Sequence, residues 1–178
     1  MQKGYDTAMQ NHISSVPWNT LALWQEANTC LAVTIRRNQS VMTESRQLTK
    51  QIQHLLESIF PHMDRLCREA CPDCADICCY RAWVWADFRD LLFLHLAGIP
   101  VPDQQLLCRQ GARCRYGGPG GCRLDRIQRP FVCTWYLCPA QTRILGDQPA
   151  EKQRLLTTLQ QIKSRRRQME TVFIRAVT

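Results

Sequence analysis

The sequence lacks any hydrophobic run long enough to cross a bilayer. Its longest strongly apolar stretch, residues 91–98, is interrupted by His95 and falls far short of the ~20 residues that a membrane-spanning helix needs. Near the N-terminus there is no uninterrupted apolar stretch and no small-residue cleavage site, both of which a secretory signal peptide requires. We therefore expect a cytoplasmic protein without a membrane segment.

The sequence also offers little for catalysis. Histidine is scarce, and no spacing would bring two of the four onto one metal ion: His12, His54, His62 and His95. His95 lies in an apolar stretch, where a core or boundary residue is expected rather than a base. A thioredoxin-like interpretation of Cys71 and Cys74 lacks the βαβ pattern that it needs. We assign no catalytic residue and, on balance, expect no enzyme.

Cysteine, in contrast, is abundant, with 11 among 178 residues. A composition that is 45% hydrophobic and 21% charged is that of a soluble globular protein, which does not need so many cysteines to fold. An odd count leaves one cysteine over in a fully paired disulfide framework, and the neighbours Cys78 and Cys79 could pair only through a strained ring. We therefore interpret the cysteines as metal ligands.

Apolar periodicity divides the chain into regions. Residues 1–16 show none and are expected to form a flexible arm. The N-terminal helical region, 17–66, should hold one helix that begins at Pro17 and a second that ends near Pro61, with a break near residues 38–40.

The central region, 67–140, is crowded with proline, glycine and cysteine and should be mostly irregular. One helix is expected within it, stopped at Gly98, with an apolar face formed by Val84, Phe88, Leu91, Leu92 and Leu96. The last region, 141–178, should hold a C-terminal helix that begins at about Gln148. This helix should pack against the N-terminal helices, and its apolar stripe is broken only by Arg166. The expected fold is mainly α, with helices flanking an irregular cysteine-rich metal-binding module.

The candidate ligands fall into two groups of four in the sequence. The first lies in CPDCADICC, and the second is spread over CRYGGPGGC, RPFVC and YLCP. A C-x2-C pair brings two sulfurs onto one ion within a tight turn, and glycines let a loop wrap an ion without Cβ strain. The predicted ligands are Cys71, Cys74, Cys78, Cys79, Cys114, Cys122, Cys133 and Cys138.

Thiolate ligands exclude magnesium and calcium, which demand oxygen, and leave zinc or iron. Two zinc sites fit eight cysteines, and so do one or two iron–sulfur clusters of the 4Fe-4S type. Cys67 and Cys108 lie near enough in sequence to be alternative ligands, whereas Cys30 is expected to be a small buried apolar residue. The pattern does not show which cysteines share a site.

Arginines surround the second group. Seven arginines and one acid lie between Cys108 and Arg143, and guanidinium groups favour the thiolate form of nearby cysteines. Aromatic side chains near the two groups are expected to shield the metal from water: Trp83, Trp85, Trp135 and Tyr136.

Residues 67–140 resemble the CxxCxxCC proteins, a family described as zinc- or iron-chelating and also called YkgJ-like cysteine cluster proteins. The resemblance implies that Cys71, Cys74, Cys78, Cys79, Cys114, Cys122 and Cys133 carry the family's ligands, that Cys138 extends the set, and that Arg129 and Pro130 match its RP pair. This sequence has three residues between Cys74 and Cys78 where the family has two, so the coordinating member of the pair Cys78 and Cys79 stays open. A similar module occurs in flagellin lysine N-methylases.

Three functions follow as expectations. The first is a metal-binding protein, non-catalytic or an electron-transfer accessory, that acts with an unknown protein partner. The second is a zinc-stabilised nucleic-acid-binding protein, because net charge is +8 and residues 163–167 read KSRRR. The third is a redox or methyl-transfer enzyme component. A radical S-adenosylmethionine enzyme, suggested by the C-x3-C-x2-C spacing of Cys67, Cys71 and Cys74, is disfavoured because the chain has no room for the surrounding barrel.

Overall fold

The computed structural model describes residues 16–72, 74, 84–118 and 121–178 and is mainly helical. Nearly all of the predicted N-terminal arm lies outside these residues. The fold class predicted from apolar periodicity is confirmed as mainly α. The elements are α1 (Leu21–Arg37), η1 (Gln39–Val41), α2 (Thr43–Ala70), α3 (Phe88–Ala97), β1 (Gly117–Gly118), β2 (Gly121–Cys122), η3 (Arg126–Gln128), α4 (Val132–Trp135), α5 (Pro139–Gly146) and α6 (Pro149–Val177).

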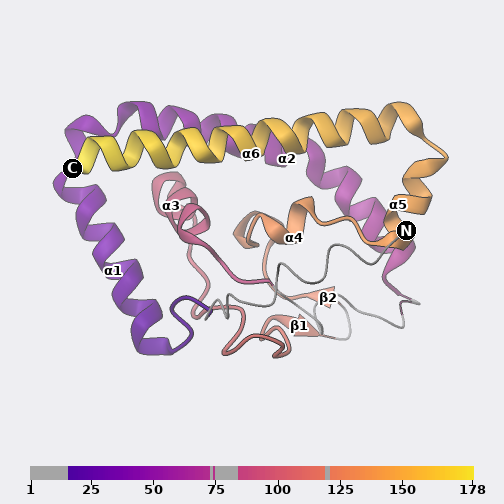
Figure 1. Ribbon diagram of the computed structural model, residues 1–178, viewed down its shortest axis with the longest axis horizontal. Coiled ribbons are helices and arrows are strands. Elements are labelled where there is room, and N and C mark those ends of the chain that lie inside the picture. Colours follow the sequence, from indigo (N-terminus) through magenta and orange to yellow (C-terminus); the bar gives the residue numbers. More distant parts are fainter. Residues whose placement is uncertain (1–15, 73, 75–83, 119–120) are drawn as a thin grey trace, which may run out of the picture.

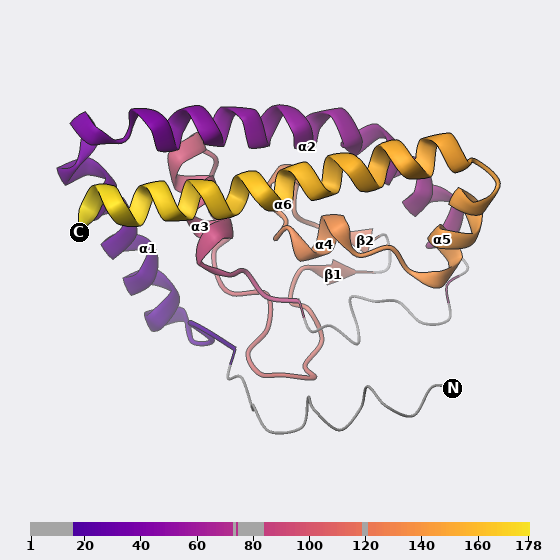
Figure 2. The same cartoon turned by 45° about the horizontal axis from the view of Figure 1, so that its top comes forward.

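The two longest helices, α2 and α6, run antiparallel and side by side (Figures 1 and 2). An ion pair between Arg175 and Glu44 at 3.7 Å marks one end of the pair, and one between Arg65 and Glu151 at 2.7 Å marks the other. The predicted packing of the C-terminal helix against an N-terminal helix is therefore confirmed. The helix begins at the residue after Gln148, as the apolar pattern indicated.

Helix α2 does not end near Pro61, and that prediction is wrong. The helix continues to Ala70 with Pro61 inside it, and Figure 1 shows its last part bending away from the rest. A proline in a helix interior costs about 3 kcal/mol. The buried stripe continues beyond the proline through Met63 and Leu66, which are 1% and 0% exposed, so core packing offsets this cost.

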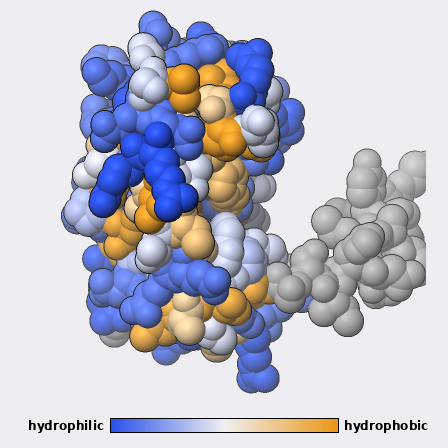
Figure 3. All heavy atoms as spheres, turned by 90° about the vertical axis from the view of Figure 1, so that its left-hand side faces the viewer, coloured by the Kyte–Doolittle hydropathy of each residue, from blue (hydrophilic) through white to orange (hydrophobic). Residues whose placement is uncertain are grey.

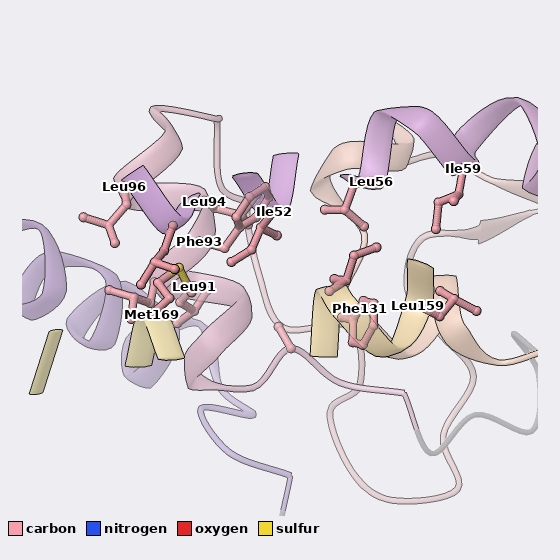
Figure 4. Close-up of a cluster of buried hydrophobic side chains, with 14 of the residues drawn as sticks. Ile52, Leu56, Ile59, Leu91, Phe93, Leu94, Leu96, Phe131, Leu159 and Met169 are labelled. Carbon is pink, nitrogen blue, oxygen red and sulfur yellow. The ribbon is translucent and has the colours of Figure 1, made fainter. Parts of the chain in front are cut away.

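Helix α3 fills the space beneath the α2–α6 pair. Asp87 and Asp90 form a capping box at its start, and Gly98, at φ +69°, ends it as predicted. Val84 precedes the helix, so its predicted place on the helical face is wrong; the capping box sets the first turn four residues later. The core between these helices is shown in Figure 4, where side chains of α2, α3 and α6 meet.

The irregular part of the described chain lies on the same side of the α2–α6 pair as α3 (Figures 1 and 2). It holds the two-residue strands β1 and β2, which pair antiparallel, and the short helix α4. The end of the molecule formed by α1 and the C-terminal part of α6 shows apolar patches separated by hydrophilic surface (Figure 3). Within the described residues, no helix is long and apolar enough to cross a membrane.

Candidate metal centre

Three cysteines of the second predicted group lie near one another, although they come from separate segments. Cys114 precedes β1, Cys122 ends β2 opposite Gly117, and Cys133 lies in α4. Cys114 is buried with Leu106 and Leu107, and Cys133 packs against this cluster. In its thiolate form Cys122 would raise the pKa of both other thiols, and a Cys114 thiolate would raise the pKa of Cys133. The structure thus places three of the predicted ligands within electrostatic range of one another.

Neighbouring groups act in opposite directions on the pKa values of the Cys114 and Cys133 thiols. Burial is the main reason that the pKa values of Cys133 and Cys114 lie above that of a free thiol. Backbone N–H groups of Tyr116 and Gly117 lower the pKa of Cys114, as does Arg123, and Arg129 lowers that of Cys133. Thiols of this kind are neutral until a cation compensates for burial, and a divalent ion at the three sulfurs would do so.

The arginines around this group have more specific partners than the sequence suggested. Arg115 donates to the Gln105 carbonyl at 3.1 Å, Arg123 to the Arg115 carbonyl at 2.5 Å, and Arg129 to the Leu124 carbonyl at 3.0 Å. They therefore fasten the loops through backbone oxygens. From the sequence, these arginines are expected to favour the thiolate form of nearby cysteines. Arg123 does so for Cys114 and Arg129 does so for Cys133, because their positive charges lower the pKa values of those thiols.

Gln105 organises the loop beside Cys114 and was missed in the sequence. Its side chain, 0% exposed, accepts hydrogen bonds from the backbone N–H groups of Ala86 and Leu106 and donates to the carbonyls of Pro17 and Ala86, all at 2.8 to 3.0 Å. This single amide joins three segments distant in sequence. No local pattern marks it, because its role depends on tertiary contacts.

A buried ion pair holds the segment that carries Cys133. Asp90 of α3 accepts a hydrogen bond from the backbone N–H of Phe131 at 2.9 Å and pairs with Arg166 of α6 at 2.8 Å. Burial raises the pKa of Asp90 to about 6, although Arg166 and two backbone N–H groups act in the opposite direction. Arg166, which interrupts the apolar stripe of α6, thus faces inward to meet this carboxylate.

Cys138 lies at the start of α5, as that helix's N-cap. Its Sγ accepts from the backbone N–H of Gln141 at 3.5 Å, and Gln141 Oε1 accepts from the Cys138 N–H at 3.2 Å. The Gln141 side chain also donates to Cys67 Sγ at 3.6 Å. Gln141 therefore connects the Cys138 sulfur to Cys67 of α2. Among the hydrogen bonds of the described residues, none joins Cys138 to Cys114.

The first predicted group is described only in part. Cys71 is the C-cap of α2, and the N–H of Cys74 bonds to the Cys71 carbonyl at 3.2 Å, which forms a tight turn. Cys78 and Cys79 lie outside the described residues. Taking residues 16–72, 74, 84–118 and 121–178 together, no three cysteine, histidine or carboxylate side chains are close enough to form a recognisable metal-ion group.

The remaining cysteines and His95 differ in their surroundings. Cys108 is exposed, and Cys30 is exposed too, so its predicted burial is wrong. The buried face of α1 is formed by Trp24, Leu31 and Ile35, and Cys30 lies beside that face. His95 Nε2 lies 2.9 Å from Asn28 Oδ1, and partial burial lowers its pKa, in keeping with the predicted boundary role.

The aromatic residues predicted to shield a metal differ in their packing. Trp85 packs against the cluster around Cys114, as does Tyr116, which the sequence did not single out. Trp135 and Tyr136 contact each other edge to face and are 49% and 45% exposed, so they do not form a closed cover. Trp83 lies outside the described residues.

Comparisons with family models, with curated proteins and with solved structures find no match for this chain.

Proposed function

We propose that this chain is a metal-binding protein that holds zinc or an iron–sulfur cluster through cysteine thiolates. The observation that carries the proposal is that Cys114, Cys122 and Cys133, which come from three separate segments, lie within range of one another's charge. Buried free cysteines can be simple apolar side chains. Cys114, however, has two backbone N–H groups and a guanidinium nearby that favour its thiolate form. Such groups are expected around a sulfur that carries charge, as a metal ligand does.

The donor set fits a soft or borderline metal. Sulfur ligands suit zinc and iron–sulfur clusters, whereas magnesium and calcium require oxygen. A bound metal would join the hairpin, the segment before it and α4, and would thereby supply local folding energy in a region with little regular structure. Within this proposal Cys71, Cys74, Cys78, Cys79 and Cys138 stay candidate ligands, as the resemblance to CxxCxxCC proteins implies.

We assign a non-catalytic or electron-transfer accessory role, exerted in the cytoplasm with a protein partner. The described residues around the three sulfurs are arginines, amides, apolar groups and, near Cys133, the carboxylate of Asp90, and we attribute to them the tasks of binding and orientation. The same chemistry would serve a redox or methyl-transfer enzyme component, and a coloured, redox-active cluster would be the first sign of one.

Single cysteine-to-serine variants test the proposal. Metal content per chain is measured for anaerobically purified full-length protein with Cys114, Cys122 or Cys133 replaced. Cys30→Ser serves as the matched control because Cys30 is exposed and lies on α1, away from the predicted ligands in sequence. We expect each of the first three substitutions to lower metal content and the control to retain it. Equal metal content in all four variants would refute the assignment of these ligands.

A second candidate function is nucleic-acid binding. Lys163, Arg165 and Arg167 line an open groove between α2 and α6, whereas Arg166 of the same run is buried in its ion pair. Replacing the three outer residues with glutamine, with Arg166 kept, tests this function and leaves the buried ion pair intact. A nucleic-acid binder should lose affinity, and its affinity should fall less steeply with salt, by about one unit of log–log slope for each phosphate that is no longer neutralised. An unchanged slope would exclude this function.

A further inference from the structure

Cys67 and Cys138 lie on either side of one buried glutamine. Cys67 is in the last turn of α2, and Cys138 begins α5, 71 residues later in the chain. Gln141 donates from its side chain to Cys67 Sγ at 3.6 Å and from its backbone to Cys138 Sγ at 3.5 Å. Because Gln141 is only 6% exposed, its position fixes both sulfurs relative to one another.

A second N–H donor points at Cys67. Arg126 Nη2 lies 3.6 Å from Cys67 Sγ, and the same guanidinium is held by Asp64, whose Oδ1 is 2.6 Å from Arg126 Nε. The Arg126 side chain is 10% exposed, so this contact forms in a largely water-free space. Side chains that bind metals are regularly held by such outer hydrogen bonds, which orient the ligand atom. A cysteine used only for packing needs neither donor.

The helix supplies a third sulfur on the same side. Cys71 follows Cys67 by four residues, and its N–H bonds to the Cys67 carbonyl at 2.9 Å, so one helical turn separates them. Residues four apart in a helix lie on one face. Cys67 and Cys138 thus lie where the end of α2 meets the start of α5, two elements that pack against each other, and Cys71 follows Cys67 one turn later.

We propose that Cys67 is a metal ligand and that it shares its site with Cys138, while Cys114, Cys122 and Cys133 belong to another site. This inference rests on the proposed metal-binding function and deepens it. Sequence order groups Cys138 with Cys114, whereas the hydrogen bonds of Gln141 group Cys138 with Cys67. The ion is of the soft class already argued, zinc or the iron of an iron–sulfur cluster. Gln141 and Arg126 are positioning residues that act through the sulfur.

Protection from alkylation tests the proposal on the unaltered full-length chain. The protein is stripped with a chelator under reducing, anaerobic conditions, titrated with zinc, treated briefly with iodoacetamide and mapped by mass spectrometry. We expect Cys67 and Cys138 to become protected together, at the same zinc equivalent, while exposed Cys30 reacts at every step. Reaction of Cys67 at one rate with and without zinc, while Cys114 is protected, would overturn the proposal. Lack of protection at all cysteines would instead refute the proposed function itself.

A variant that keeps both sulfurs gives the second test. Gln141→Met preserves side-chain volume but removes the N–H donor to Cys67, and we expect zinc affinity to fall about 10- to 100-fold. Gln128→Met, at a glutamine whose side chain donates to the Pro100 carbonyl, is the matched control and should leave affinity unchanged. Equal zinc affinity in the two variants and the wild type would contradict a positioning role.

Discussion

Arg166 Nη2 lies 2.8 Å from Asp90 Oδ1, and both side chains are nearly inaccessible to solvent, at 6% and 7% exposed. The guanidinium also lies over the Phe131 ring, 5.0 Å from its centroid, and Asp90 accepts the Phe131 N–H. The pair therefore ties α3 and α6 to the segment that carries Cys133. It links the helical frame to a candidate ligand through groups that are shielded from water.

Breaking this pair should destabilise the fold strongly. Arg166→Met leaves Asp90 buried without its cationic partner, and loss of one member of a buried pair costs about 3 to 5 kcal/mol. Urea denaturation followed by circular dichroism measures the free energy of unfolding. Arg165→Met, at a neighbouring exposed arginine, is the control and should change it by less than about 0.5 kcal/mol. Similar losses in the two variants would show that the pair has no special structural role.

Gln105 should be equally sensitive to substitution. Gln105→Leu has similar volume but leaves backbone groups of Ala86, Leu106 and Pro17 without their partner, and each buried unpaired group costs about 1 to 3 kcal/mol. Hydrogen exchange of the amides at residues 84–86 and 104–107 should accelerate in this variant. Gln104→Leu removes the neighbouring side chain and is the control. Unchanged exchange in Gln105→Leu would show that the Gln105 amide does not hold the loop.

The long helices could be predicted from the sequence, because helical periodicity and end signals are local. The predicted start of the first helix at Pro17 is wrong, since α1 begins at Leu21 after an N-cap at Thr20. Gly98 ends α3 and Pro149 opens α6 close to where the pattern placed them. Pro61 misled the prediction of α2, since a local helix breaker was outweighed by packing of Met63 and Leu66 against residues far away in sequence. Local sequence signals therefore mispredict the end of a helix where tertiary packing determines it.

The candidate site could be predicted only in its residue types. Spacing and the glycine-rich loop singled out Cys114, Cys122 and Cys133, which the structure places near one another. Which cysteines share a site was left open by the sequence, and the hydrogen bonds of Gln141 that connect Cys138 to Cys67 could not be predicted because these two cysteines lie far apart in the chain. Asp90 and Arg166 could not be paired either, since nothing local connects α3 with α6.

Metal affinity should rise with pH. Burial holds the pKa values of Cys114 and Cys133 above that of a free thiol, so at neutral pH both carry protons in the metal-free chain. A metal binds the thiolate, so each proton displaced strengthens binding about 10-fold per unit rise in pH below the thiol pKa. Zinc competition with a chromophoric chelator at pH 6.5 and pH 8 measures this slope.

Two variants serve as controls for the pH dependence of zinc affinity. Cys133→Ser removes one titrating ligand, so the pH dependence of any remaining zinc binding at that site should be shallower by the contribution of one proton. Cys30→Ser should retain the wild-type slope. Zinc affinity that is independent of pH in the wild type would contradict binding through these protonated thiols.

Elemental analysis of the full-length protein, purified without oxygen, decides whether the cysteines hold metal. We predict stoichiometric zinc in a colourless protein, with about two ions per chain if both sites are filled, or iron with acid-labile sulfide in a brown protein. In either case the ligand thiols should react with alkylating reagents only after the metal is removed. Protein that contains neither metal, remains folded and has every cysteine free to react would show that this chain is not a metal-binding protein.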